Sequence, residues 1–219
     1  NLRRYKNYRA QSVDERSLIK NGIIVIENFL PCEEFNQLKQ EFYLALSKYE
    51  NKKTVKKGSM HVDIRQIKGD DFNEFPTIKK FAKNEKLIKL IAAAEGVKVV
   101  DQFSKLDLET TKFGDPSKDE DLNVPFHADV HFHSHKVLFY INDVKLDGGP
   151  FIYCKNSHKN KFDRLLFELM RGQLKDSHEE KWRIQKHLDK NFFKKYFQKL
   201  KKQEYKVACP ANTLVIANV

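Results

Sequence analysis

Two side chains that commonly bind metals lie two positions apart near the middle of the chain, in the tripeptide His127-Ala128-Asp129. Side chains at positions i and i+2 of a β-strand point to the same face, about 7 Å apart along the strand. An imidazole and a carboxylate would then face the same space, as in the 2-His-1-carboxylate site that holds non-heme Fe(II) with open positions. The tripeptide alone also fits a half-buried strand with one polar pair, so both interpretations stay open.

Three further histidines, His131, His133 and His135, have the same parity as His127 and precede Lys136 in an expected turn. Positions i and i+4 of one extended strand are about 13 Å apart, so one strand cannot surround a single ion. The third iron ligand is therefore expected from another strand. Two alternatives stay open for these histidines: one of them contacts the iron, or they form an adventitious Zn²⁺ or Ni²⁺ site, because imidazole also suits these metals.

Strands are expected directly after the tripeptide. An apolar run at 137–144, a glycine-proline turn at 148–150 and a second apolar run at 151–153 predict a strand, a hairpin and another strand. The strand pattern returns near the end of the chain, at 205–208 and 213–219. These strands would place the histidine and the carboxylate on a sheet.

Helical spacing of apolar residues dominates the first hundred residues. The sequence predicts a helix at 12–21 that ends at Gly22, a strand at 23–26, a helix that starts at Pro31, and two helices between 77 and 94 that are broken near Asn84. Leucines alternate with charged residues at 105–109, which predicts a strand with one solvated face. Residues 48–60 are charged and contain glycine, which predicts a loop.

The size and composition indicate one globular domain over residues 1–219. The chain has 41 basic and 30 acidic side chains, a net charge of +11, so anionic partners are plausible. Its three cysteines are widely spaced and odd in number, which excludes a disulfide framework and favours a reducing, cytoplasmic location. No signal-peptide pattern or apolar run long enough to span a bilayer is present, so no membrane association is predicted.

The residues around the tripeptide resemble the phytanoyl-CoA dioxygenase family of Fe(II)/2-oxoglutarate oxygenases, especially its bacterial branch. The family pattern is FHxD, a short His-containing turn, Lys, an apolar strand ending in Asp-Val, a Gly-Pro turn, an aromatic strand and Ser-His-Lys. The matching residues follow without a gap: Phe126-His127-Ala128-Asp129, His131 to His135, Lys136, Asn142-Asp143-Val144, Gly149-Pro150-Phe151 and Ser157-His158-Lys159. Residues 210–217 are similar to the family's strand before its distal iron histidine.

The resemblance implies an α+β fold with a double-stranded β-helix, which is a jelly-roll, cupin-like barrel with packed helices. It implies His127 and Asp129 as metal ligands, with Fe(II) and 2-oxoglutarate as cofactors. It also implies that His158 holds the turn behind the metal rather than binding it.

Two sets of residues on the strand after the tripeptide could line the co-substrate. The first set is Lys136, Leu138 and Tyr140; the second is Val137, Phe139 and Ile141. The resemblance favours the first set, in which Lys136 could meet a carboxylate and Tyr140 could donate a hydrogen bond. The alternative is that both are ordinary strand residues.

Residues 159–202 interrupt the strand pattern with apolar residues at helical spacing. They include 14 Lys or Arg and 6 Asp or Glu, a net charge of +8, so most of the excess charge lies here. We expect a basic helical insert outside the barrel strands and near the barrel mouth. Its Trp182 and its phenylalanines should be buried, while its lysines stay exposed.

The family's distal histidine and its 2-oxoglutarate-binding arginine follow the strand at 210–217, whereas the sequence stops at Val219. We expect the natural chain to continue, which would leave the C-terminal strands incomplete and this 219-residue form inactive. The alternative is a shortened, inactive relative.

The predicted function is Fe(II)/2-oxoglutarate-dependent hydroxylation of a small molecule, with 2-oxoglutarate converted to succinate and CO₂. The basic insert is compatible with an anionic substrate. The alternative function is a catalytically inactive barrel that binds an anionic partner. No recognised nucleic-acid motif is present, so the sequence does not favour nucleic acid as that partner.

Overall fold

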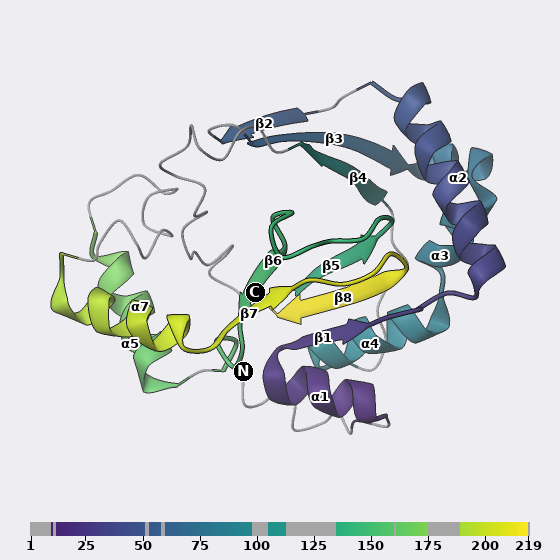
Figure 1. The fold of residues 1–219 in the computed structure, drawn as a ribbon. Helices are drawn as coiled ribbons and strands as arrows, with labels where there is room; N and C mark the ends of the chain where they lie inside the picture. The colour runs from purple at the N-terminus through teal and green to yellow at the C-terminus, as the bar shows by residue number, and fades with distance from the viewer. Residues whose placement is uncertain are drawn as a thin grey trace.

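The structure is a computed structural model, and it describes residues 10, 12–50, 53–57, 60–97, 105–112, 135–159, 161–174 and 189–218. The described strands form three antiparallel sheets, with the orders β1–β8–β5, β2–β3–β4 and β6–β7 (Figure 1). Their bounds are β1 Ile23–Ile26, β2 Lys53–Lys57, β3 Met60–Lys68, β4 Lys105–Lys112, β5 His135–Tyr140, β6 Phe151–Cys154, β7 Glu204–Val207 and β8 Thr213–Asn218. The predicted mixture of helices and strands is confirmed, but the described strands do not close into a barrel.

Strand β8 lies at the centre of the first sheet and pairs with β1 on one side and β5 on the other. All six of its residues are buried. Leu214 and Ile216 pack in a cluster with the helices, whereas Val215 and Ala217 pack in a second cluster with residues of β6 and β7. Because successive side chains of a strand point to opposite faces, this sheet separates a helix-covered layer from a layer against β6 and β7.

The helices of the first hundred residues begin and end near the predicted positions. Their bounds are α1 Val13–Asn21, α2 Cys32–Lys48, the short 3₁₀ helix η2 Gly69–Glu74, α3 Pro76–Ala82 and α4 Glu85–Glu95. Helix α1 begins where the Ser12 hydroxyl accepts a hydrogen bond from the amide of Glu15 at 3.1 Å, and it ends at Gly22 with φ of 79°. Asn84 separates α3 from α4, because its side chain accepts a hydrogen bond from the amide of Leu87.

Helix α4 covers the helix-side face of the central sheet, as predicted. Its buried residues include Leu87, Leu90, Ile91 and Ala94, which share one cluster with Ile216 of β8. Helix α1 packs beside α4, and both lie against this sheet (Figure 1).

Residues 53–57 form strand β2, whereas the sequence predicted a loop over 48–60. This strand pairs antiparallel with β3, with Lys53 opposite Ile64, and the Thr54 hydroxyl donates a hydrogen bond to Asp63 at 2.8 Å. The loop prediction was therefore wrong here. Strand β2 is the edge of its sheet, where charged side chains are common because they discourage pairing with other chains.

Strands β5 and β6 follow each other in the chain but do not form the predicted hairpin. Strand β5 ends at Tyr140 and pairs with β8, whereas β6 pairs with β7. The turn at 148–150 therefore carries the chain from one sheet to another. Strands that are close in sequence often pair as a hairpin. Here β5 and β6 lie in two different layers and pack face to face instead.

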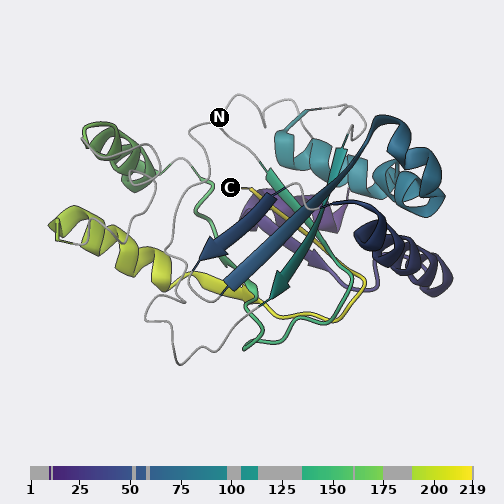
Figure 2. The same cartoon turned by 90° about the horizontal axis from the view of Figure 1, so that it is seen from above.

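The described part of the predicted insert consists of helix α5 (Phe162–Gly172) and helix α7 (Asn191–Lys201), which lie side by side and project from the sheets (Figure 1, Figure 2). Phe167 and Phe193 are buried, as predicted. The side chain of Phe162 is 75% exposed, so the prediction that the phenylalanines are buried was wrong there. Trp182 lies outside the described residues. No helix among the described residues has the length and apolar composition to cross a membrane.

Candidate functional site

The predicted metal ligands His127 and Asp129 lie outside the described residues, as do His131 and His133. The structure does describe the frame on their C-terminal side, because β5 begins at His135. Within the described ranges, no three His, Cys, Asp or Glu side chains come close enough to hold a metal ion.

The start of β5 lies beside the end of β8. In the antiparallel register, His135 is opposite Asn218 and Tyr140 is opposite Thr213. The start of β5 and the end of β8 therefore lie side by side at one end of the central sheet (Figure 1).

His135 itself points to the helix side of this sheet. Its Nδ1 atom lies 2.7 Å from Oε1 of Glu95, the last residue of α4. The contact fixes the start of β5 against the end of α4. His135, the first residue of β5, therefore contacts the helix layer through Glu95.

The side chains of β5 divide between the two layers. Leu138 and Tyr140 pack in the cluster that contains Val215, whereas Phe139 packs on the helix side, with its ring centroid 4.7 Å from that of Phe81 in α3. The Lys136 ammonium lies 5.8 Å from the ring centroid of Phe151 in β6. The structure thus places Lys136, Leu138 and Tyr140 together on the face toward β6 and β7.

Tyr140 carries a neutral hydroxyl in this layer. Burial raises the pKa of Tyr140 to about 12, and two groups act in the same direction: Cys209, once its thiol ionises at alkaline pH, and the carboxylate of Glu109. A hydrogen bond with the backbone of Phe151 acts in the opposite direction and is outweighed. The phenol therefore stays protonated at neutral pH and can donate a hydrogen bond.

Glu109 of β4 contributes the smallest of the effects that raise the pKa of Tyr140. The sequence left two positions open for Asp107 and Glu109, a solvated strand face and the mouth of the barrel. Leu108 of β4 is buried against the helix-side cluster, so its neighbours Asp107 and Glu109 point to the opposite face, where both are exposed. The amide of Gln66 in β3 donates a hydrogen bond to Asp107 at 2.7 Å. The alternation at 105–109 predicted this solvated face, which the structure confirms.

His158 fastens the turn after β6 to helix α1. Its Nε2 atom lies 3.0 Å from the carbonyl oxygen of Ile19, and the amide of Asn156 donates to the carbonyl of Asn21 at 2.9 Å. A side chain at Gly22 would collide with the imidazole of His158 and with the Tyr153 hydroxyl, so only glycine fits there.

Tyr153 extends this connection to the end of β8. Its hydroxyl donates a hydrogen bond to the carbonyl of Asn218 at 2.8 Å. Burial raises the pKa of Tyr153 to about 12, so the hydroxyl keeps its proton for this bond at neutral pH. The end of β8 is thereby held beside the start of β5.

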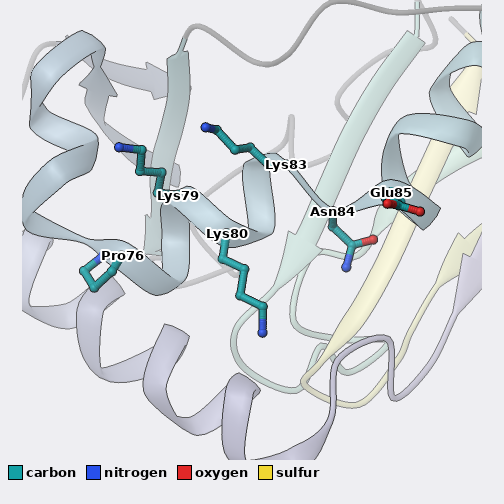
Figure 3. Close-up of a pocket in the computed structure, with 6 residues that line it drawn as sticks. All are labelled: Pro76, Lys79, Lys80, Lys83, Asn84 and Glu85. Atoms are coloured by element: carbon teal, nitrogen blue, oxygen red, sulfur yellow. The ribbon is translucent and has the colours of Figure 1, made fainter.

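A hollow of about 500 Å³ lies elsewhere, between α3 and α4, and none of the sequence-predicted site residues lines it (Figure 3). Its lining residues are Pro76, Lys79, Lys80, Lys83, Asn84 and Glu85. In the close-up, Lys79 and Lys83 extend to one side and Lys80 extends to the other (Figure 3). Lys80 forms an ion pair with Glu34 at 2.8 Å, and Lys79 donates a hydrogen bond to Asn73 at 2.7 Å.

The family model for phytanoyl-CoA dioxygenase (PhyH) matches residues 18–203. The chain belongs to the phytanoyl-CoA dioxygenase family. The matched range includes the central tripeptide, strands β5 and β6, and both described helices of the insert. This family depends on Fe(II) and 2-oxoglutarate, which are the cofactors predicted from the sequence.

A solved structure with a similar fold is that of the epimerase SnoN in complex with Fe³⁺, alpha-ketoglutarate and nogalamycin RO. The two chains are 14% identical, with a TM-score of 0.53, and the similarity covers 94% of this chain and 72% of the epimerase chain. At this identity the likeness concerns the fold. No curated protein matches the chain.

Proposed function

We propose that this phytanoyl-CoA dioxygenase family member is an Fe(II)/2-oxoglutarate-dependent oxygenase that hydroxylates a small molecule. The family match over residues 18–203 carries this proposal. It is supported by the antiparallel sheets and by a β5 face that presents a cation, an apolar residue and a neutral hydroxyl to one layer. We further propose that the strands belong to a double-stranded β-helix.

His127 and Asp129 are the proposed metal ligands, since an imidazole and a carboxylate suit Fe(II). The third ligand is proposed to follow β8, because the register places Asn218, at the end of β8, opposite His135, the first residue of β5. Fe(II) with bound 2-oxoglutarate supplies oxygen activation, with 2-oxoglutarate converted to succinate and CO₂. Tyr153 positions the end of β8 through its hydrogen bond to the carbonyl of Asn218, and His158 holds the turn after β6 against helix α1.

The β5 face is proposed to receive 2-oxoglutarate. The Lys136 ammonium can bind a carboxylate with a charge-assisted hydrogen bond. Tyr140 can donate a second hydrogen bond, because its pKa of about 12 keeps the hydroxyl protonated. Leu138 lies between them in the strand and can exclude water from the co-substrate.

The experiment that tests the reaction is succinate formation by the full-length protein, with Fe(II), 2-oxoglutarate and O₂. Anaerobic addition of Fe(II) and 2-oxoglutarate should also give a metal-to-ligand charge-transfer band. His127→Ala should remove both signals, whereas His61→Ala, which changes a histidine of β3, should keep them. If His127→Ala retains iron binding and succinate formation, the ligand assignment is wrong.

A second measurement separates the co-substrate from the metal. Lys136→Gln should raise the KM for 2-oxoglutarate on the order of tenfold or more, because it removes a charged hydrogen-bond partner. The matched control is Lys105→Gln on the exposed edge of β4, which should leave this KM unchanged. An unchanged KM in Lys136→Gln would assign the lysine to an ordinary strand position.

The substrate is proposed to be a small molecule, with an anionic one as the specific expectation. Turnover of a soluble anionic substrate should then fall with ionic strength, since screening acts over about 10 Å at 0.1 M salt. Because the similar solved enzyme is named an epimerase, the product must be identified as well as succinate. An oxygen atom incorporated from O₂ into the product would support hydroxylation.

A further inference from the structure

The aromatic ring of Phe151, the first residue of β6, lies against the β5 face that carries Lys136, Leu138 and Tyr140. The Lys136 ammonium is 5.8 Å from the centroid of this ring. At that distance the electrons of the ring attract a cation. The ring has no net charge, so it holds the ammonium without neutralising it. The contact with Phe151 therefore leaves the positive charge in place to attract a carboxylate.

The backbone of Phe151 contacts Tyr140 on the same face. The hydrogen bond between this backbone and the Tyr140 hydroxyl acts to lower the pKa of the phenol. A bond with that effect favours the ionised oxygen, so the Phe151 amide is the donor and the hydroxyl oxygen is the acceptor. The hydroxyl keeps its own hydrogen for donation to a second group. One residue of β6 thus contacts both groups that are proposed to bind 2-oxoglutarate.

Tyr153 supports the ring of Phe151 from the same face of β6. The two ring centroids are 6.5 Å apart and the ring planes are inclined by 27°. The Tyr153 hydroxyl in turn donates its hydrogen bond to the carbonyl of Asn218 at the end of β8. A continuous series of contacts therefore connects Lys136 with the end of β8, where the third metal ligand is proposed to follow.

We propose that Phe151 is a positioning residue for 2-oxoglutarate, whose ring holds the Lys136 ammonium and whose backbone orients the Tyr140 hydroxyl. An unrestrained lysine side chain has many rotamers, and fixing it when a ligand binds costs conformational entropy. Contact with the ring before binding reduces this cost, so the lysine binds a carboxylate more tightly. The inference rests on the proposed function, because it assigns Phe151 to the co-substrate site of that reaction.

The test is the Kd of 2-oxoglutarate for the full-length protein loaded with Fe(II) in the absence of oxygen, measured by equilibrium dialysis with labelled 2-oxoglutarate. Phe151→Leu keeps an apolar side chain but removes the ring, so it should raise this Kd about fivefold. Phe151→Tyr keeps the ring and should bind 2-oxoglutarate as the unaltered protein does. In turnover, Phe151→Leu should raise the KM for 2-oxoglutarate by the same factor and change kcat less, because saturating co-substrate compensates for weaker binding.

Tyr205→Leu is the matched control. Tyr205 belongs to β7, packs in the same cluster as Phe151 and has the Lys155 ammonium 3.9 Å from its ring centroid. The variant therefore also loses a ring and a contact with a lysine, but Lys155 is not proposed to bind the co-substrate, so the Kd should stay the same. Circular dichroism establishes that each variant is folded, and Phe151→Met is the second ringless variant if Phe151→Leu is not.

A double-mutant cycle separates positioning from a general effect on the fold. In the Lys136→Gln background, Phe151→Leu should not change the Kd further, because the ring acts through the ammonium. If Phe151→Leu leaves the Kd of the otherwise unaltered protein unchanged, or raises it equally in both backgrounds, the inference is wrong while the proposed function stands. If the unaltered protein binds no 2-oxoglutarate, the inference and the proposed function both fail.

Discussion

Strand β8 and helix α5 are both rich in apolar residues, yet the protein uses them differently. Every residue of β8 is buried, including the polar Thr213 and Asn218, because the strand lies between two others and between two layers. In α5 only Phe167 and Arg171 are buried, since one neighbouring helix covers one side. The comparison shows that a residue is buried, and so contributes to the free energy of unfolding, according to how many strands and helices pack around it. The apolar content of its own element matters less.

The largest difference is expected for paired truncations in the two elements. Ile216→Ala in β8 should lower the free energy of unfolding by about 2–5 kcal/mol, because it leaves a cavity in a fully buried site. Leu169→Ala in α5 should change it by at most about 0.5 kcal/mol. Urea unfolding of both variants measures the contrast, and equal losses would show that the exposed side of α5 around Leu169 is covered in solution.

A second contrast is between two asparagines with positive φ, the buried Asn212 and the less buried Asn156. Its side chain accepts a hydrogen bond from the amide of Leu30 at 3.0 Å and donates one to the carbonyl of Leu30 at 2.7 Å. Asn212→Gly keeps the backbone conformation but removes both bonds, so unfolding free energy should fall by about 1–3 kcal/mol. Asn156→Gly, in the turn after β6 with φ of 66°, should cost less than about 1 kcal/mol.

If Asn156→Gly lowers the free energy of unfolding as much as Asn212→Gly does, the difference in burial between the two asparagines does not control their contribution. Urea unfolding of both variants measures this. Asn212→Ala should be worse than Asn212→Gly, because alanine also strains the left-handed backbone at φ of 61°.

Alkaline pH should lower the free energy of unfolding through two neighbouring residues of β6. Tyr153 packs in the cluster with β8, and Cys154 packs in the cluster with α5 and α7. Burial raises the pKa of Tyr153 from 10.0 to about 12 and that of Cys154 from 9.0 to about 12. In each case the unfolded chain releases its proton first. The stabilisation by these two protonated groups is therefore fully present below pH about 9 and is lost as pH rises toward about 12. In that range the free energy of unfolding should fall by up to about 1.4 kcal/mol per pH unit for each group.

Urea unfolding at a series of pH values tests this slope. Cys154→Ala should remove the part of this pH dependence that begins near the ordinary pKa of a thiol. Tyr153→Phe should remove the part that begins near the ordinary pKa of a phenol. A pH dependence that neither variant changes would assign the alkaline loss to other groups.

The smallest effect is expected for the ion pair between Lys199 and Asp163, which connects the two helices of the insert. Both side chains are partly exposed, so Lys199→Met should lower the free energy of unfolding by less than about 1 kcal/mol, and added salt should reduce the difference. A larger loss would indicate that the helix pair depends on this contact for its arrangement.

Local signals in the sequence were sufficient for most helices. Ser12, Gly22 and Asn84 have side chains or backbone freedom that begin or end a helix without help from distant residues, and each does so. The apolar spacing in α4 likewise predicted the face that packs on the central sheet.

Long-range pairing limited the other predictions. The strand at 53–57 exists because β3 pairs with it, and its lysines gave no local indication of that. Phe162 was predicted to be buried from its spacing, but α7 lies on the opposite side of α5. In the candidate site, the sequence identified the residues of β5 that share a face, whereas the pairing of β5 with β8 and of β6 with β7 depends on distant residues, which no local pattern specifies.

The central position of β8 also sets the order in which the sheet can be made. Ile23 of β1 pairs with Ala217 of β8, and β5 pairs with the same strand, so neither flanking strand has its neighbour until the ribosome has synthesised the end of the described chain. Contacts between residues so far apart in sequence form slowly, and unpaired apolar strands favour aggregation in the meantime. Newly made chains should therefore depend on chaperones until β8 emerges and joins the two strands.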